Sequence, residues 1–218
     1  MRETSFNDSR VSSYFDKVAD RFDTIYRSDK SIGKKLVDGL FRSVVHRRFD
    51  YTMGLLSEVQ GKRVLDVGCG SARYGIELAR QGANIVGLDF ASGMVEIAKK
   101  AAQEAGVADI CSFAECDFLS WNSETSYDIC LAIGFFDYIQ KPRVFLKRMN
   151  ELNAEDYVFS FPKRWTLRTL PRWIRLNASG CPVYFYDLNQ ISKLLIDVGW
   201  SDFKIESLSR DYLVHVGR

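Results

Sequence analysis

The chain has 218 residues, of which 46% are hydrophobic and 27% are charged, and its formal net charge is +2. This length and apolar content suit one substantial core, so we expect a single domain over residues 1–218. A charge so close to neutral argues against nucleic-acid binding. The sequence contains no run of about twenty apolar residues, so no transmembrane helix is predicted. The polar first residues argue against a signal peptide.

The five cysteines form no Cys-x-x-Cys pair, and three of them fall in predicted strands or at strand ends. We therefore expect free, buried thiols in a reducing cytoplasm rather than disulfides or a zinc site. The sequence also lacks a cluster of Asp, Asn and Glu at the spacing of metal ligands, so no bound metal is predicted.

Two helices, over residues 9–27 and 31–58, come first in the predicted order of elements. The first carries Tyr14 and Phe15 on an apolar face, and the run His46-Arg47-Arg48 in the second reads as a solvated face. Strands and helices alternate from residue 62 onward, which predicts βαβ units and a parallel sheet. Strands are predicted over residues 64–67, 84–88, 110–115, 127–133, 156–161, 203–208 and 212–216, and helices over residues 72–81, 91–105, 142–152 and 188–198.

An irregular basic stretch is expected before the last of these helices. The link between the last two strands, residues 209–211, is so short that they must form a hairpin. The predicted fold class is therefore α/β, with a Rossmann-like, seven-stranded and mostly parallel sheet. Helices are expected on both faces, and one C-terminal strand is expected to be antiparallel.

An apolar strand, a carboxylate and two glycines follow one another in residues 62–71, Lys-Arg-Val-Leu-Asp-Val-Gly-Cys-Gly-Ser. Gly68 and Gly70 permit a sharp turn and the close approach of a ligand to the backbone. Arg73 occupies the place of the third glycine of a dinucleotide motif, and Asp66 repels a pyrophosphate. A carboxylate at this position suits a cationic ligand instead, and S-adenosylmethionine carries a sulfonium and an ammonium group.

Carboxylates also end the next two predicted strands. Asp89 lies about twenty residues beyond the glycine turn, where a side chain can accept hydrogen bonds from both ribose hydroxyls. Phe90 and Met94 offer a flat and a soft apolar surface to an adenine ring. Asp117 can accept the adenine amino group, and Phe118 can help to close the ring slot.

These segments resemble the class I S-adenosylmethionine-dependent methyltransferases, in particular small-molecule enzymes of the ubiquinone-biosynthesis and magnesium-protoporphyrin types. The matching stretches are Val64-Leu-Asp-Val-Gly-Cys-Gly70, Gly87-Leu-Asp-Phe90, Gly93-Met-Val-Glu-Ile-Ala98, Ala114-Glu-Cys-Asp-Phe118 and Tyr127-Asp-Ile-Cys-Leu-Ala-Ile133. The resemblance implies S-adenosylmethionine as the cofactor. Its implied contacts are Asp66, Gly68, Cys69 and Gly70 around the methionine part, Asp89 at the ribose, Cys116, Asp117 and Phe118 at the adenine, and Ile133 on the methionine side.

The same resemblance divides the chain by role. Residues 1–60 are expected to form a helical cap over the site, and residues 61–160 to bind the cofactor. Residues 161–187 correspond to an insertion that covers the acceptor, and residues 188–218 to a closing helix and hairpin.

Candidates for handling the acceptor follow the fourth strand, in Gly134-Phe-Phe-Asp-Tyr138. Asp137 or Tyr138 can orient or deprotonate an acceptor; alternatively, the phenylalanines are pocket wall and Asp137 caps a helix. Related enzymes often carry a histidine here, and this chain does not. Tyr14 can bond the donor carboxylate or the acceptor, although a tyrosine on an amphipathic helix also suits the core. His215, in the last strand, reads as structural.

The segment 163–175 carries five positive charges and no acid, among apolar side chains such as Trp165 and Trp173. It predicts contact with an amphipathic or anionic acceptor, or peripheral docking at an anionic membrane surface. A solvated, arginine-rich lid is the alternative.

The sequence therefore predicts S-adenosylmethionine-dependent O- or N-methylation of a small organic molecule by a cytoplasmic monomer or homodimer. The segment after the fourth strand lacks the proline pair of nucleic-acid amino methyltransferases, and Cys181-Pro182 reverses the Pro-Cys order of cytosine C5 enzymes. Two alternatives stay open: a nicotinamide-dependent oxidoreductase, which Asp66 and Arg73 disfavour, and a domain that binds S-adenosylmethionine without catalysis.

Overall fold

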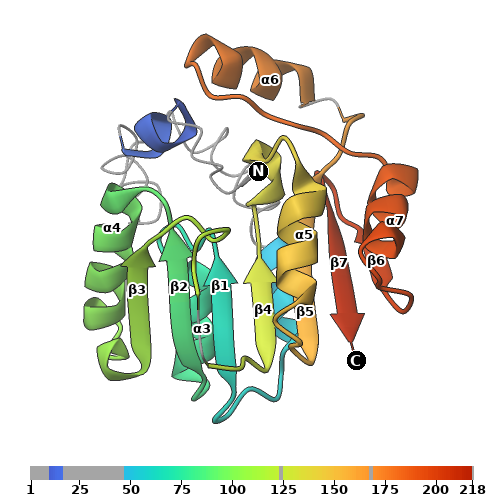
Figure 1. Cartoon of the computed structure of the whole chain (residues 1–218). Coiled ribbons are helices and arrows are strands. Elements are labelled where there is room, and N and C mark those ends of the chain that lie inside the picture. The colour runs from blue at the N-terminus through green and yellow to red at the C-terminus, as the bar shows by residue number, and fades with distance from the viewer. Residues whose placement is uncertain (1–9, 17–46, 123–124, 167–168, 218) are drawn as a thin grey trace.

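A computed structural model describes residues 10–16, 47–122, 125–166 and 169–217. Seven strands form one sheet in the order β3-β2-β1-β4-β5-β7-β6 (Figure 1). All strand pairs are parallel except those that β7 makes with β5 and β6, which confirms the predicted fold class with its one antiparallel C-terminal strand. The strands are β1 (Arg63–Val67), β2 (Asn84–Asp89), β3 (Cys111–Glu115), β4 (Ile129–Ala132), β5 (Asp156–Pro162), β6 (Lys204–Ser207) and β7 (Asp211–Gly217).

Burial along the strands follows their place in the sheet. All four residues of β4 are buried, as are all but the first residue of β1 and of β5. The edge strands β3 and β6 are mostly exposed. Continuous apolar runs rather than alternation mark the inner strands because helices cover both of their faces.

Helices pack on the two faces of the sheet in separate groups. One apolar cluster includes side chains of α5 and α7, and a second includes side chains of α3 and α4. Residues 10–16 and 47–55 are also helical. The helices are α3 (Arg73–Arg80), α4 (Ser92–Glu104), α5 (Pro142–Asn150), α6 (Thr169–Ala178) and α7 (Leu188–Asp197), with short 3-10 turns η1 (Ala108–Ile110) and η2 (Phe136–Tyr138).

The ends of two helices match the local sequence signals. Gly106, at φ +71°, follows α4, as the glycine signal predicted. At the start of α7, Asp187 accepts a hydrogen bond from the Gln190 backbone N–H at 2.9 Å, and the Gln190 side chain accepts one from the Asp187 N–H at 3.1 Å. This capping box sets the point at which α7 begins.

The expectation of an irregular stretch before α7 is wrong, because α6 occupies Thr169–Ala178. Pro171 lies in the first turn of this helix, where a missing N–H breaks no intrahelical bond. Figure 1 shows α6 and the helical residues 10–16 above the carboxyl edge of the sheet.

The two predicted N-terminal helices lie largely outside the described residues, and the second ends at residue 55 rather than 58. No helix in the described ranges is long and apolar enough to cross a bilayer.

Candidate active site

Backbone hydrogen bonds hold the glycine turn after β1. The N–H groups of Gly68 and Cys69 both donate to the carbonyl of Leu88 at the end of β2, at 2.8 and 3.0 Å. Gly68 and Gly70 have φ values of +69° and +54°, which side chains with a Cβ rarely adopt. A Cβ at Gly70 would meet no atom within 4 Å, whereas one at Gly68 would lie 2.6 Å from Phe135 Cδ2. Gly70 therefore borders open space, and Gly68 lets the loop after β4 approach the turn.

Asp66 lies beneath this turn and is only 3% exposed. Burial, and then the negative charge of Asp89, raises the pKa of Asp66 to about 7, although a hydrogen bond from the Gly75 backbone opposes the rise. A ligand cation beside this carboxyl lowers its pKa again, so the position favours a positively charged guest.

Asp89 is fixed at the end of β2 by two backbone donors. Its Oδ2 accepts a hydrogen bond from the Gly70 N–H at 2.9 Å, and its Oδ1 accepts one from the Ala91 N–H at 3.0 Å. Burial raises the pKa of Asp89, and these two bonds oppose the rise. Each oxygen has a second lone pair, so the oriented carboxylate can still accept hydroxyl groups.

Two glycines outside the predicted motif let neighbouring elements pack closely. A Cβ at Gly75 in α3 would lie 2.9 Å from Ile85 Cγ2 in β2. One at Gly87 would lie 2.5 Å from the Phe113 ring and 3.0 Å from Cys69 Sγ. In a dinucleotide motif the third glycine serves such helix–strand packing. Here Gly75 does so, and its signal in the sequence is a glycine in the first turn of the predicted helix.

The N-terminal helical residues cover the segment after β2. Phe90 and Phe15 pack in one apolar cluster, and Met94, 2% exposed, also packs against Phe15. The Gly93 N–H donates to Asp16 Oδ1 at 3.3 Å. The two side chains predicted to face an adenine therefore share apolar clusters with Phe15 of the N-terminal helical residues.

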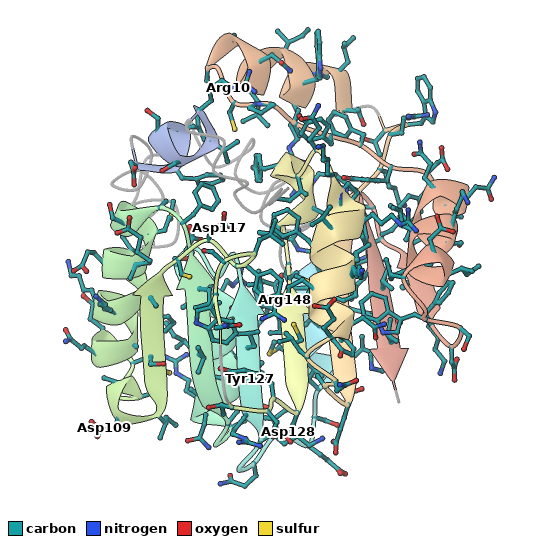
Figure 2. The ribbon with its side chains drawn as sticks, viewed as in Figure 1. Arg10, Asp109, Asp117, Tyr127, Asp128 and Arg148 are labelled. Atoms are coloured by element: carbon teal, nitrogen blue, oxygen red, sulfur yellow. The ribbon has the colours of Figure 1, made fainter. Side chains whose placement is uncertain are left out.

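The residues after β3 lie beside Asp89. The Cys116 N–H donates to the Asp89 carbonyl at 2.8 Å, and Figure 2 shows Asp117 at the carboxyl edge of the sheet. Asp117 Oδ1 accepts a backbone hydrogen bond from two residues further on, at 3.0 Å. Phe118 is 3% exposed and stacks on Phe145 with 6.4 Å between ring centroids. Adenine contacts for these residues stay predictions.

The loop after β4 brings the acceptor candidates to α6. Ile133 and Asp137 are buried, and Asp137 Oδ2 accepts a hydrogen bond from Arg172 of α6. The short helix η2 has no side-chain cap, so Asp137 does not act as one. Tyr138 meets Phe15 edge-on, with ring centroids 5.0 Å apart. Burial raises the pKa of Tyr138 to about 12, although Arg172 opposes the rise.

Tyr14 reaches the same cluster as Tyr138 and Phe15, and its ring lies edge-on to Phe15 at 5.4 Å. The structure therefore brings together three aromatic residues from the N-terminal stretch and the loop after β4. The roles assigned to Tyr14 and Tyr138 stay predictions.

Arg48 is an important residue that the sequence pattern misplaced. Its side chain is 11% exposed rather than solvated; its Nε donates to Tyr74 Oη at 3.1 Å and its Nη1 to Asp211 Oδ2 at 3.1 Å. Burial lowers its pKa, but Tyr74, Asp211 and Asp137 together raise it above the ordinary value. The guanidinium also lies beside Gly134. No local signal distinguishes this arginine from Arg47, which is exposed.

Several cations of the basic segment already have partners. Arg172 pairs with Asp137, and Arg164 lies 3.6 Å from Asp187. The Lys163 ammonium group donates hydrogen bonds to the hydroxyl of Ser207 in β6 and to the carbonyl of Leu208, the residue after β6. Arg172 is therefore not a free surface charge.

Apolar side chains of this segment border a groove of about 830 Å³ between α6 and α7. Trp165, Leu170 and Trp173 line it and are 87%, 64% and 48% exposed. Residues 183–186 and Leu194 also line the groove.

All five cysteines are free thiols. Within the described ranges, no group of three or more His, Cys, Asp and Glu side chains is placed to hold a metal ion.

A family of sequences described as a methyltransferase domain matches residues 58–197. A ubiquinone biosynthesis O-methyltransferase of Azorhizobium caulinodans is 33% identical over 114 residues, which are 52% of this chain and 45% of the relative. One of Bordetella avium is 27% identical over 141 residues, 57% of this chain and 58% of the relative. The match thus covers less than two thirds of the length of these relatives.

Among solved structures, the fold is similar to magnesium protoporphyrin IX methyltransferase of Synechocystis PCC 6803. The form with bound SAH has a TM-score of 0.79 at 22% identity, and the match covers 96% of this chain and 98% of the other.

Proposed function

This chain belongs to the methyltransferase domain family, and from that premise we propose that it transfers a methyl group from S-adenosylmethionine to a small organic acceptor. The observation that carries the proposal is the pair of buried carboxylates, Asp66 and Asp89, at adjacent strand ends beside open space at Gly70. This pair attracts a sulfonium and an ammonium group and repels a pyrophosphate. The same charges, with the family match, disfavour a nicotinamide-dependent oxidoreductase.

The residues present fit each part of that donor. Asp66 suits its cationic end, and the oriented oxygens of Asp89 suit the two ribose hydroxyls. We assign the methionine part to Asp66, Gly68, Cys69, Gly70 and Ile133, the ribose to Asp89, and the adenine to Phe90, Met94, Cys116, Asp117 and Phe118.

S-adenosylmethionine supplies an activated methyl group, so the chief task of the protein is to hold the acceptor in line with it. The close contact of Phe135 with Gly68 links the donor turn to the loop that carries Asp137 and Tyr138. Residues 10–16 and α6 pack over this loop in one apolar cluster. We propose that both segments cover the acceptor and exclude water, and that Tyr14 helps to orient it.

Titration calorimetry tests donor binding directly. We expect micromolar affinity for S-adenosylmethionine and its demethylated product, and none for NADH. Asp89→Asn should weaken donor binding at least tenfold, because an amide cannot accept two hydroxyl protons as a carboxylate does. Binding of NADH instead contradicts the proposal.

Single-turnover transfer from radiolabelled S-adenosylmethionine to a small-molecule cell extract separates an enzyme from a silent binding domain. If S-adenosylmethionine binds but no methyl group is transferred, the protein is a silent binding domain.

We also propose peripheral contact with an anionic membrane surface through the α6 surface, which comprises Trp165, Leu170, Trp173 and Ile174. These four side chains are 48–87% exposed within a segment that contains no acid. Exposed aromatic and aliphatic side chains beside cations are typical of interfacial binding.

Vesicle flotation tests this contact. Phosphatidylglycerol vesicles should bind the protein more strongly than phosphatidylcholine vesicles, and the double substitution Trp165→Ser with Trp173→Ser should abolish the difference. Val144→Ser, which changes an exposed apolar residue of α5, serves as the control. Equal binding of both vesicle types favours the alternative in which residues 163–175 form a solvated, arginine-rich lid.

We propose a cytoplasmic location, supported by the five free thiols. The choice between monomer and homodimer stays a prediction that light scattering can decide.

A further inference from the structure

One extended segment, residues 183–186, separates the groove between α6 and α7 from the aromatic cluster that holds the acceptor candidates. These residues line the groove. The Tyr184 N–H donates to the Asp137 carbonyl at 2.8 Å, which ties the segment to the loop after β4. Phe185 also packs in the apolar cluster that contains Phe15. The groove is therefore a second compartment beside the site proposed for methyl transfer.

The groove has the size and the apolar wall of a small-molecule site. Its volume is about 830 Å³, and sites for small ligands occupy roughly 300–1,000 Å³. Leu170 and Trp173 of α6 line it, and Leu194 of α7 adds a third apolar side chain. An α-helix with its side chains is about 10–12 Å wide, so this volume holds only about two turns of one. The groove thus fits a small apolar ligand better than a helix of a partner protein.

Polar lining residues gather near the start of α7. Arg164 Nη1 lies 3.6 Å from Asp187, the residue that caps this helix, and Gln190 bonds to the same residue. Lys193 follows Gln190 by three residues, so the two side chains share one face of the helix. Arg164, Gln190 and Lys193 all line the groove. The groove therefore has an apolar wall from α6 and polar, cationic side chains toward α7.

The charge at this wall is positive. Two cations, Arg164 and Lys193, and one carboxylate, Asp197, line the groove, so the lining carries a net charge of +1. The contact of Arg164 with Asp187, at 3.6 Å, is longer than a hydrogen bond. Lys193 lies 3.3 Å from Asp197, but its side chain is 77% exposed, and such surface pairs are weak. Both cations can therefore turn toward an anionic group of a ligand.

From this arrangement we propose that the groove binds a long-chain carboxylate of the fatty-acid class, taken up as a single molecule from solution. Its alkyl chain lies against Leu170, Trp173 and Leu194, and its carboxylate meets Arg164 and Lys193. An ammonium head group on the same chain would meet these two cations as like charges. This ligand is neither the methyl donor nor the acceptor, so the site goes beyond the proposed function.

Tryptophan fluorescence measures this binding, because Trp165 and Trp173 both line the groove. Dodecanoate, dodecyltrimethylammonium and butyrate, each kept below its critical micelle concentration, separate the effect of the chain from that of the charge. We expect dodecanoate to bind at least tenfold more tightly than either of the other two. If the cationic amphiphile or butyrate binds as tightly as dodecanoate, the proposal is overturned.

Variants then place the ligand in the groove. Leu170→Ser should weaken dodecanoate binding about tenfold, because it removes part of the apolar wall. Ile174→Ser is the matched control: Ile174 is an exposed residue of the same helix, but it is not among the described residues that line the groove. Equal losses in the two variants would show adsorption to the outer surface of α6 and overturn the proposal. Arg164→Gln combined with Lys193→Gln should reduce the preference for dodecanoate over the cationic amphiphile, and an unchanged preference contradicts the role of the two cations.

Donor and vesicle binding distinguish the possible failures. If S-adenosylmethionine binds and dodecanoate does not, the groove assignment is wrong and the proposed methyl transfer stands. If dodecanoate binds and S-adenosylmethionine does not, the proposed function fails and the groove assignment stands. Binding to vesicles without binding of monomeric dodecanoate assigns the exposed side chains to membrane contact alone and overturns the proposal. A labelled methyl ester of dodecanoate, formed in a single turnover, would show that the carboxylate reaches the donor, and it overturns the separate site.

Discussion

Replacing Asp66 by Asn should stabilise the ligand-free protein at pH 8 while it abolishes donor binding. Burial, with the charge of Asp89 as the second cause, raises the pKa of Asp66 from 3.8 to about 7. Between these two pH values the folded protein holds a proton that the unfolded chain has lost. The stability contributed by this proton is therefore complete at low pH and is lost as the pH rises through about 7.

The size of the effect follows from the difference between the two pKa values. About three pKa units at 1.36 kcal/mol each correspond to about 4 kcal/mol. Asn carries no charge to bury and can still accept the Gly75 N–H, but its amide hydrogens need partners of their own, which costs about 1–3 kcal/mol. We therefore expect a net gain of about 1–3 kcal/mol at pH 8. At pH 4 Asp66 is already neutral in the folded protein, so only the amide cost remains and the variant should be less stable by about 1–3 kcal/mol.

Urea unfolding, followed by circular dichroism at several pH values between about 5 and 8, measures this difference. Asp109→Asn is a matched control, because Asp109 is exposed and lies at the opposite end of the sheet (Figure 2). Calorimetry on the same samples reports donor affinity. A variant whose stability varies with pH as the wild type does would refute the burial argument, and undiminished donor affinity would refute the assignment of Asp66 to the cationic end of the donor.

Three further predictions follow from the structure. Because donor binding requires ionised Asp66, with its pKa of about 7, donor affinity should rise about tenfold from pH 6 to pH 8; a flat profile contradicts this assignment. Gly75→Ala should lower the free energy of unfolding by about 1–3 kcal/mol, because the added Cβ would lie 2.9 Å from Ile85. Gly54→Ala, whose Cβ would meet no atom within 4 Å, should instead raise it by about 0.5–1 kcal/mol. Denaturant midpoints compare the two variants. His215→Gln should lower stability by less than about 1 kcal/mol, because the 2.8 Å contact of its ring with the Asp156 carboxylate of β5 is partly exposed. It should leave methyl transfer unchanged; a loss of transfer would show that the histidine is not merely structural.

Local patterns in the sequence were sufficient for most elements of the fold. The short link before β7 required an antiparallel pair, and the structure has β6 and β7 paired in that way. The position of β7 between β5 and β6 had no local signal. Strand order depends on which apolar edges meet in space, and no pattern along a single strand specifies its neighbour.

Helix α6 shows where local patterns failed. Its first turn contains Pro171 and its sequence is rich in arginine, so it reads as irregular. Its position over the site depends on Leu176 in the apolar cluster and on the bond from Arg172 to Asp137. Both contacts join residues far apart in the sequence, and tertiary packing often overrides weak helix propensity.

The donor side of the site could be predicted from local sequence patterns, whereas the acceptor side depends on tertiary contacts. Asp66, Gly68, Gly70 and Asp89 lie within a short span of chain, at the ends of two adjacent parallel strands, so their convergence follows from sequence order and sheet geometry alone. The partners Arg172 and Asp137, and likewise Arg48 and Asp211, come from elements that only the folded chain brings together. An arginine has the same local signature whether it is solvated or buried, and only a carboxylate placed against it by the fold decides between the two.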